Sequence, residues 1–194
     1  MVWAKNGTPD TLGSAGDLMT ISDMSASKFN MFMIHEIGSG TIETTAILNN
    51  DTGTNYAYRY SIDGAADGTG VSQTKYSGNA GASPDRFYII YTSSISGEEK
   101  LGINMLNESN TAGAGTAPRR MELVSKYVPS PDADITRIDD TNTGGGDFAI
   151  SSNLSALGSD GTESLNVQDG AIYYDTDLNK EYVLYNNTWT ELWP

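Results

Sequence analysis

Few residues of the types that most often perform chemistry are present in this chain. His35 is the only histidine among 194 residues, and cysteine is absent, which excludes disulfides and thiolate metal sites. A catalytic histidine works with a nucleophile and an orienting partner. Alternation along "MFMIHEI" instead places His35 on the strand face of Met33 and Ile37. We therefore predict a partly buried, hydrogen-bonded histidine and not a general base.

Carboxylates are numerous, and a pair of them could hydrolyse a glycosidic bond. Such a pair must be held about 5 to 9 Å apart with one raised pKa. The stretch "HEIGSGTIET" offers only Glu36 and Glu43 across a predicted hairpin, and no strand has the near-alternating Glu, Asp and Glu of lectin-like jelly-roll glycosidases. We interpret the carboxylates as solvated charges and predict no catalytic residue and no enzyme activity.

Aspartates in loops could bind calcium through their oxygens. None of these loops fits the twelve-residue calcium-loop pattern, and Asp beside Gly also permits tight turns. We predict ordinary turn chemistry and no cofactor, with calcium as the weaker alternative. The aspartates concerned are Asp63, Asp67, Asp132, Asp134, Asp139 and Asp140.

The segment "YAYRYSID" places Tyr56, Tyr58 and Tyr60 on one face of a predicted strand and Arg59 on the other. Aromatic rings with polar tips could form a sugar-stacking platform or a protein contact. Half-buried core packing would suit the same row, and the sequence leaves both interpretations open. These four residues are the candidate ligand or partner contact.

The elements that position these residues are short strands between turns rich in Gly, Asn and Asp. The run 28–37 is apolar on both faces, which predicts a central strand. A "GSG" turn then leads into the alternating strand 42–48, with Ile42, Thr44, Ala46 and Leu48 inward, so we expect a hairpin. Further strands are predicted at 56–63, 86–96, 101–109, 121–129, 133–140 and 147–158.

Alternation sets a common face within some of these strands. Leu101, Ile103 and Met105 share one, and Phe148 shares another with Ile150. Strands about 10 to 15 residues apart without helical periodicity predict an all-β fold, an antiparallel β-sandwich with jelly-roll-like connectivity. We assign residues 1–157 to the sandwich, 158–169 to a linker or surface loop, and 170–194 to a small C-terminal β-meander.

Charge limits the possible partners. The chain has 11 basic and 25 acidic residues, a net charge of −14. Binding of nucleic acid needs a basic face, so we expect no nucleic-acid partner. An anionic membrane would repel the chain, and no segment approaches the roughly 18 apolar residues of a membrane span. The N-terminal residues do not form a secretory leader, so we expect synthesis in a cytosol.

The stretch "GAIYYDTDLNKEYVLYNNTW", residues 170–189, predicts short strands with aromatic contacts between them. A meander of this size is marginally stable alone and must dock on something. We therefore predict that its aromatic residues form a subunit contact. They are Tyr173, Tyr174, Tyr182, Tyr185, Trp189 and Trp193.

This stretch resembles a short β-meander that recurs in tail-fibre, head-fibre and other virion structural proteins of bacteriophages. The matching positions are Gly170, Tyr173, Tyr174, Asp175, Thr176, Asn179, Lys180, Tyr182, Tyr185 and Trp189. The segments "ISGEEKLGI" and "TAGAGTAPRRMELVSKYVPSP" are similar in texture to single-jelly-roll proteins of marine phages and viruses.

The resemblance implies a capsid decoration, spike or fibre component on the virion surface, made in the host cytoplasm. It also implies a homo-oligomer, a trimer first, that contacts other virion proteins and takes part in host attachment. The alternative function is a carbohydrate-binding receptor-recognition module on the same sandwich. Its partner would be a host surface glycan and its contacts the row from Tyr56 to Tyr60.

Overall fold

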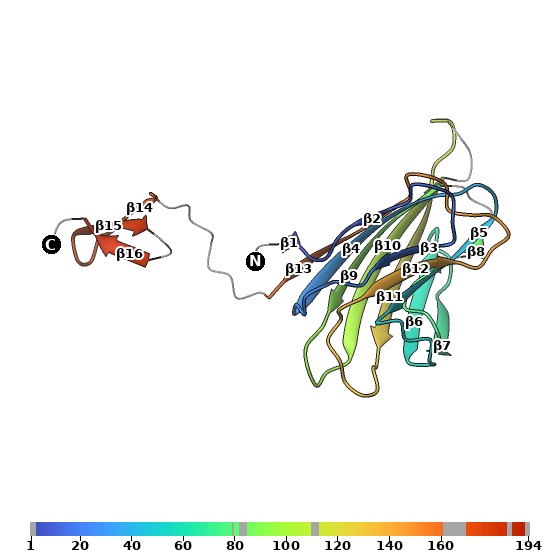
Figure 1. The fold of residues 1–194 in the computed structure, drawn as a ribbon, viewed down its shortest axis with the longest axis horizontal. Helices are drawn as coiled ribbons and strands as arrows, with labels where there is room; N and C mark the ends of the chain where they lie inside the picture. The colour runs from blue at the N-terminus through green and yellow to red at the C-terminus, as the bar shows by residue number, and fades with distance from the viewer. Residues whose placement is uncertain are drawn as a thin grey trace. The chain divides into compact units, whose positions relative to one another are not determined.

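The computed structural model describes residues 3–78, 80–81, 85–109, 113–160, 170–185 and 188–192. In this part of the chain every regular element is a β-strand (Figure 1). The chain divides into two compact units, one spanning Trp3–Asp160 and one that contains the described residues after 169. Trp193, a predicted contact residue, lies outside the described residues.

Among the described residues, the longest strands belong to the first unit. The strands of the first unit are β1 (Ala4–Lys5), β2 (Asp10–Thr11), β3 (Leu18–Ile21), β4 (Phe29–Ile37), β5 (Ile42–Leu48), β6 (Tyr56–Ile62), β7 (Gly68–Gln73), β8 (Ala80–Gly81), β9 (Asp85–Ser93), β10 (Lys100–Ser109), β11 (Arg119–Tyr127), β12 (Ile138–Asn142) and β13 (Asn153–Ser159). Those of the second unit are β14 (Ile172–Asp175), β15 (Lys180–Tyr185) and β16 (Thr188–Glu191).

Within the described residues these strands form antiparallel sheets of nine, four and three strands. The large sheet has the order β1-β13-β4-β9-β10-β11-β6-β7, with β2 also paired to β13; the small sheet has the order β3-β12-β5-β8. The third sheet is the terminal meander β14-β15-β16. The predicted all-β class, antiparallel sandwich and C-terminal meander are confirmed. The sheets of the sandwich are unequal, whereas a jelly roll arranges eight strands as two Greek keys, so the jelly-roll connectivity stays a prediction.

The core lies between the large and small sheets because strands of both have one alternating apolar face. Phe32 and Ile34 of β4 are completely buried, and so are Ile42 and Leu48 of β5. The predicted inward face of β5 is confirmed, since its even-numbered residues are all buried. The core therefore rests on the period-two pattern of its strands.

The predicted hairpin between residues 28–37 and 42–48 is wrong. β4 belongs to the large sheet, where it pairs with β13 and β9, and β5 belongs to the small sheet, where it pairs with β12 and β8. Residues 38–41 therefore connect one layer to the other. The physical reason is that β4 is a central strand, and both of its edges are occupied by strands distant in sequence.

Two predicted strands are shorter than expected. In 133–140 only the end is extended, since β12 begins at Ile138. In 147–158 the strand begins at Asn153, because Ser151 has a positive φ of 73° and the chain turns there. Phe148 is consequently buried while Ile150 is exposed, although alternation places them on one face. β13 continues to Ser159, beyond the predicted sandwich limit at residue 157.

Candidate functional site

The clearest site candidate begins with the alternation of β10. Leu101, Ile103 and Met105 share one strand face, as predicted, and all three are exposed. On the opposite face Lys100 and Glu108 are buried. The strand therefore points three apolar side chains to solvent and two charged side chains inward, although Leu106 of the same strand is buried in the core.

Neighbouring strands continue this apolar surface. Ile103 lies beside Tyr91 of β9 and Val124 of β11, and Met105 lies beside Ile89 of β9. We call the solvent-facing side of β4, β9, β10 and β11 the outer face. Its exposed apolar side chains are Phe87, Tyr91, Leu101, Ile103, Met105 and Val124, which are 41–59% exposed.

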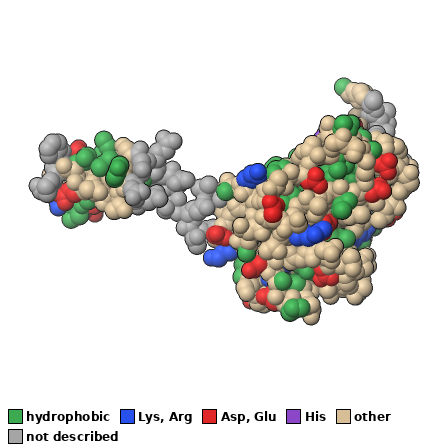
Figure 2. All heavy atoms as spheres, in the orientation of Figure 1, with side chains coloured by type: hydrophobic (Ala, Val, Ile, Leu, Met, Phe, Trp, Pro, Cys, Tyr) green, Lys and Arg blue, Asp and Glu red, His purple; other side chains and the backbone are tan. Residues whose placement is uncertain are grey.

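The outer face extends toward β4 and the N-terminal residues. Met31 of β4 is half-buried and lies beside Tyr91 in the sheet, and the ring of Trp3 meets the Tyr91 ring edge-on at 6.4 Å between centroids. Figure 2 shows hydrophobic side chains among acidic ones on the surface of the sandwich. A contiguous exposed apolar patch on a soluble chain indicates a protein contact surface.

The charges around the outer face differ from those of the whole chain. By strand register, the basic side chains of Lys5, Arg59, Arg120 and Lys126 point to this side of the large sheet. The acidic side chains on the described strands of this side are Asp85 and Glu122. The outer face therefore lacks the acidic excess of the chain.

The terminal meander carries a second candidate surface. Tyr173 lies opposite Tyr182, and Leu184 lies opposite Trp189. Directly opposed residues share a face of the sheet, so Tyr173, Tyr182 and Trp189 lie on one side. Asp175 joins them because it is two residues from Tyr173. We call this side the aromatic face.

The rings of the aromatic face form a corner. Tyr173 and Tyr182 are stacked with centroids 6.1 Å apart, and Trp189 crosses Tyr173 at 63° with centroids 5.8 Å apart. An open hollow of about 370 Å³ is lined by these rings and Asp175. Figure 2 shows hydrophobic side chains at the surface of this unit.

The other predicted aromatic contacts lie on the opposite side of the meander. Tyr174 and Tyr185 alternate away from Tyr173 and Tyr182 along their strands. The Tyr174 hydroxyl donates a hydrogen bond to the Asn179 side-chain oxygen. The meander thus separates its predicted contact residues into two surfaces.

The structure places the tyrosine row of β6 on the inner side of the large sheet, with the Tyr58 and Tyr60 ring centroids 6.0 Å apart. Tyr56 is buried and stacks on Tyr127 with ring centroids 4.8 Å apart. The ring of Tyr58 lies over Gly70 of β7, where an added Cβ would be 2.6 Å from the ring carbon Cζ. Tyr60 likewise packs on Gly68. The half-buried core interpretation describes these rings, and Arg59 points to the other side, paired with Asp67.

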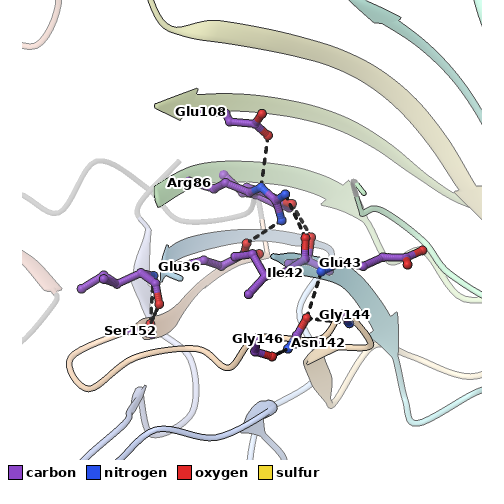
Figure 3. A network of polar contacts seen from close by, with 12 residues as sticks. Glu36, Ile42, Glu43, Arg86, Glu108, Asn142, Gly144, Gly146 and Ser152 are labelled. Carbon is purple, nitrogen blue, oxygen red and sulfur yellow. Dashed lines mark hydrogen bonds and ion pairs between the residues drawn. The ribbon is translucent and has the colours of Figure 1, made fainter. Parts of the chain in front are cut away.

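A buried network of charges connects the two sheets of the sandwich. The Arg86 guanidinium of β9 donates to Glu108 of β10 (Nε–Oε2 3.1 Å), to Glu36 of β4 (Nη1–Oε2 3.4 Å) and to the Ile42 carbonyl of β5 (3.1 Å). Figure 3 shows Arg86 between the two glutamates. Glu108 also accepts from Arg119 at 2.8 Å. Because Ile42 belongs to the small sheet, Arg86 joins both layers.

Asp140 of β12 adds a further carboxyl group to this network. Burial raises the pKa of Glu36 well above its ordinary value, and Asp140 raises it further, while Arg86 opposes both effects. Burial also raises the pKa of Asp140 to about 7, opposed by its hydrogen bond with Glu36 and by Arg86. Glu36 Oε1 and both Asp140 carboxyl oxygens have no donor among the described residues. When one of these two carboxyl groups carries a proton, its O–H donates a hydrogen bond to the other carboxyl group.

This carboxyl pair is the arrangement nearest to a glycosidase site, yet Glu36 and Asp140 are completely buried. A polysaccharide therefore cannot reach them. Glu43, the other half of the predicted pair, lies on β5 and not across a hairpin from Glu36. Sequence reasoning missed the network, although Glu36 inside an apolar run is the signal that could have indicated it.

The aspartates considered for calcium mostly pair with basic side chains. Asp63 contacts Arg119, Asp67 contacts Arg59, and Lys100 donates to Asp132 at 2.9 Å. Asp139 accepts from Arg137 at 2.7 Å. Asp140 belongs to the buried network, and the side chain of Asn49 donates to the Asp134 carbonyl. Within the described ranges no three acidic or histidine side chains lie close enough together to hold a metal ion.

The prediction for His35 is wrong in its burial. The side chain is exposed at the end of β4, where the outer face begins, because the inward residues of this strand are the even-numbered ones. In the part of the chain that the structure describes, no helix is long and apolar enough to cross a membrane. No protein-family model matches the chain, and no similar protein is found among curated sequences or solved structures.

Proposed function

We propose that this chain is a structural protein on the surface of a virus particle that acts by self-assembly and attachment, and that copies assemble through the outer face. The observation that carries the proposal is an exposed apolar sheet face on a chain of net charge −14. The similarity of residues 170–189 to a meander of phage virion proteins supports the location on a particle.

The size of the outer face suits a specific interface. It spans four strands of nine or ten residues. With strands about 4.8 Å apart and about 3.4 Å per residue, it covers roughly 600 Å² in projection. Standard interfaces bury about 800 Å² of accessible surface per partner. Protruding side chains make the accessible surface larger than the projection, so the face is large enough for this purpose.

The charges favour a second copy as the occupant. Two chains of net charge −14 repel each other over most of their surface. On this side of the large sheet three of the four basic side chains pair with nearby carboxylates: Lys126 with Glu99 at 3.0 Å, Arg59 with Asp67 at 3.2 Å and Arg120 with Glu122 at 3.8 Å. Repulsion is therefore lowest where the apolar area is largest, and two outer faces can meet.

The test is the mass of the full chain in solution by light scattering. Ile103→Asp places a charge in the middle of the outer face, and we expect the wild-type oligomer to become a monomer. Ile150→Asp is the matched control, since Ile150 is 60% exposed and Ile103 59%, and Ile150 lies in a turn. A monomeric wild type at high concentration contradicts assembly, as does an equal effect of both substitutions.

The symmetry and the location need separate measurements. A flat face packed on its own copy gives a two-fold pair, whereas the resemblance implies a trimer, and the measured mass distinguishes them. For the location, antibodies against the chain should label purified particles from cultures that carry the sequence. Absence from purified particles contradicts the virion proposal even if the chain assembles.

A further inference from the structure

The cavity of the aromatic face is not used by assembly through the sandwich. It is a hollow of about 370 Å³ that is open to solvent, so a small ligand group can reach its lining. Three of its four described lining residues are aromatic: Tyr173, Tyr182 and Trp189. The fourth is Asp175, so the described lining combines ring surfaces with one carboxylate.

The ring geometry suits a cation. A cation is attracted to the negative face of an aromatic ring when it lies within about 6 Å of the centroid. Tyr173 and Trp189 cross at 63° with centroids 5.8 Å apart, so one small group in the corner can contact both rings. Both rings are about half exposed, which leaves surface for a ligand.

The charges of the aromatic face have the matching sign. Asp175 Oδ1 accepts from the backbone N–H groups of Asp177 and Leu178 at 2.9 and 3.0 Å. Its other oxygen accepts no hydrogen bond from the described residues. Lys180, the basic residue of this face, pairs with Glu191 at 2.8 Å. These three charged groups leave one negative charge beside the rings, on a chain that is acidic throughout.

We propose that the aromatic face binds a quaternary ammonium group, such as the trimethylammonium of choline. Such a group has no hydrogen-bond donor, so ring faces and one carboxylate satisfy it fully. A sugar presents several hydroxyl groups and needs several polar partners, which the described lining does not supply. A neutral apolar ligand would gain nothing from Asp175.

The test is titration of the full chain with choline, followed by NMR chemical shifts of the meander. Choline is compared with 3,3-dimethyl-1-butanol, its uncharged carbon analogue, and with methyl β-glucoside. We expect choline to bind at least about tenfold more tightly than the butanol, since the charge supplies the difference. Equal binding of choline and the butanol, preference for the glucoside, or no binding of choline overturns the proposal.

Two substitutions locate the site. Asp175→Asn keeps a side-chain oxygen for the turn at Asp177 while it removes the charge, and we expect about a tenfold loss of choline affinity. Tyr185→Ala is the matched control, because Tyr185 is 72% exposed on the opposite side of the same strands. Unchanged affinity of Asp175→Asn, in a meander whose other shifts stay in place, overturns the assignment.

Discussion

Two buried carboxyl groups, Glu36 and Asp140, lie beside one guanidinium that is already paired with Glu108. A buried ionised carboxyl without a full set of partners is costly. The pair lowers this cost by keeping a proton, which joins one oxygen of each carboxyl that otherwise has no donor among the described residues. At the residue scale the interior of this sandwich is therefore sensitive to pH.

The raised pKa values of both carboxyl groups of this pair predict a stability that falls as pH rises. The folded pKa of Asp140, about 7, is above its unfolded value. Its stabilising contribution is complete below the unfolded pKa, near 3.9. It declines as pH rises from there and is lost above about 7. Urea unfolding at pH 5, 6, 7 and 8 measures how the free energy of unfolding changes with pH.

Glu36→Gln gives the matched variant for this prediction. The amide that replaces the Glu36 carboxyl group donates a hydrogen bond to Asp140 and does not titrate. The free energy of unfolding should therefore depend less steeply on pH than in the wild type. At pH 8 the variant should be more stable than the wild type by roughly 1–3 kcal/mol. An identical slope in both proteins shows that the pair does not control the pH dependence.

Arg86 provides a second residue-scale prediction. Arg86→Met leaves Glu36 buried without a cation and Glu108 with Arg119 as its remaining cation, so the free energy of unfolding should fall by about 3–5 kcal/mol. Arg59→Met is the control, because the Arg59–Asp67 pair is exposed and such pairs contribute about 0–1 kcal/mol. Denaturant unfolding at pH 7 compares them, and similar losses in both contradict the assigned role of the network.

At the scale of elements, β10 shows how one strand supports both the core and a surface. Gly102 lies on its inner face, where an added Cβ would collide with the hydroxyl of Tyr76. That hydroxyl is buried and shares a hydrogen bond with Thr92 at 2.7 Å. The absent side chain thus makes room for a buried tyrosine under the outer face.

Gly102→Ala should therefore destabilise the sandwich by about 1–3 kcal/mol, since overpacking displaces Tyr76. Gly115→Ala is the control, because nothing lies within 4 Å of a Cβ built there. Thermal or urea unfolding measures the difference. Equal stability of the two variants contradicts the close approach of Gly102 and Tyr76.

The alternation in the sequence predicts where the strands lie better than it predicts which face of each strand meets the core. It identifies β4, β5, β9, β10 and β11 and the common face of Leu101 and Ile103. It does not tell which side of β10 meets the core, because that depends on strands distant in the chain. The same limit explains the wrong hairpin: "GSG" signals a turn, but a turn within a sheet and a crossing between sheets have similar sequences.

The candidate surfaces were predictable to different degrees. The aromatic residues of the meander were identified from Tyr173 to Trp189, but their division between two sides needed the register. The outer face was missed, since exposed apolar residues on a strand are usually assigned to a core. The charge network was missed because Glu36 and Arg86 are 50 residues apart.

At the scale of the whole molecule, the sandwich should fold without the meander. All residues of its buried core lie between Met19 and Ala156. A chain stopped after Asp160 should therefore melt within about 3 °C of the sandwich transition of the full chain. Calorimetry measures this, and a large drop contradicts the independence of the two units.

The mass of the same truncated chain separates two routes of assembly. If the outer face is the interface, the truncated chain keeps the oligomeric state of the full chain. If it becomes a monomer while its melting temperature is unchanged, the meander is the assembly element and the role of the outer face is contradicted.

The position of β13 has a consequence for synthesis. β13 lies between β4 on one side and β1 and β2 on the other, so residues 153–159 complete a sheet begun by residues 4–37. Until they leave the ribosome, the very apolar strand β4 has an open edge, and open edges pair with other chains. A nascent chain therefore carries this open edge until residues 153–159 have been made, and a chaperone that covers the edge should raise the yield of folded protein.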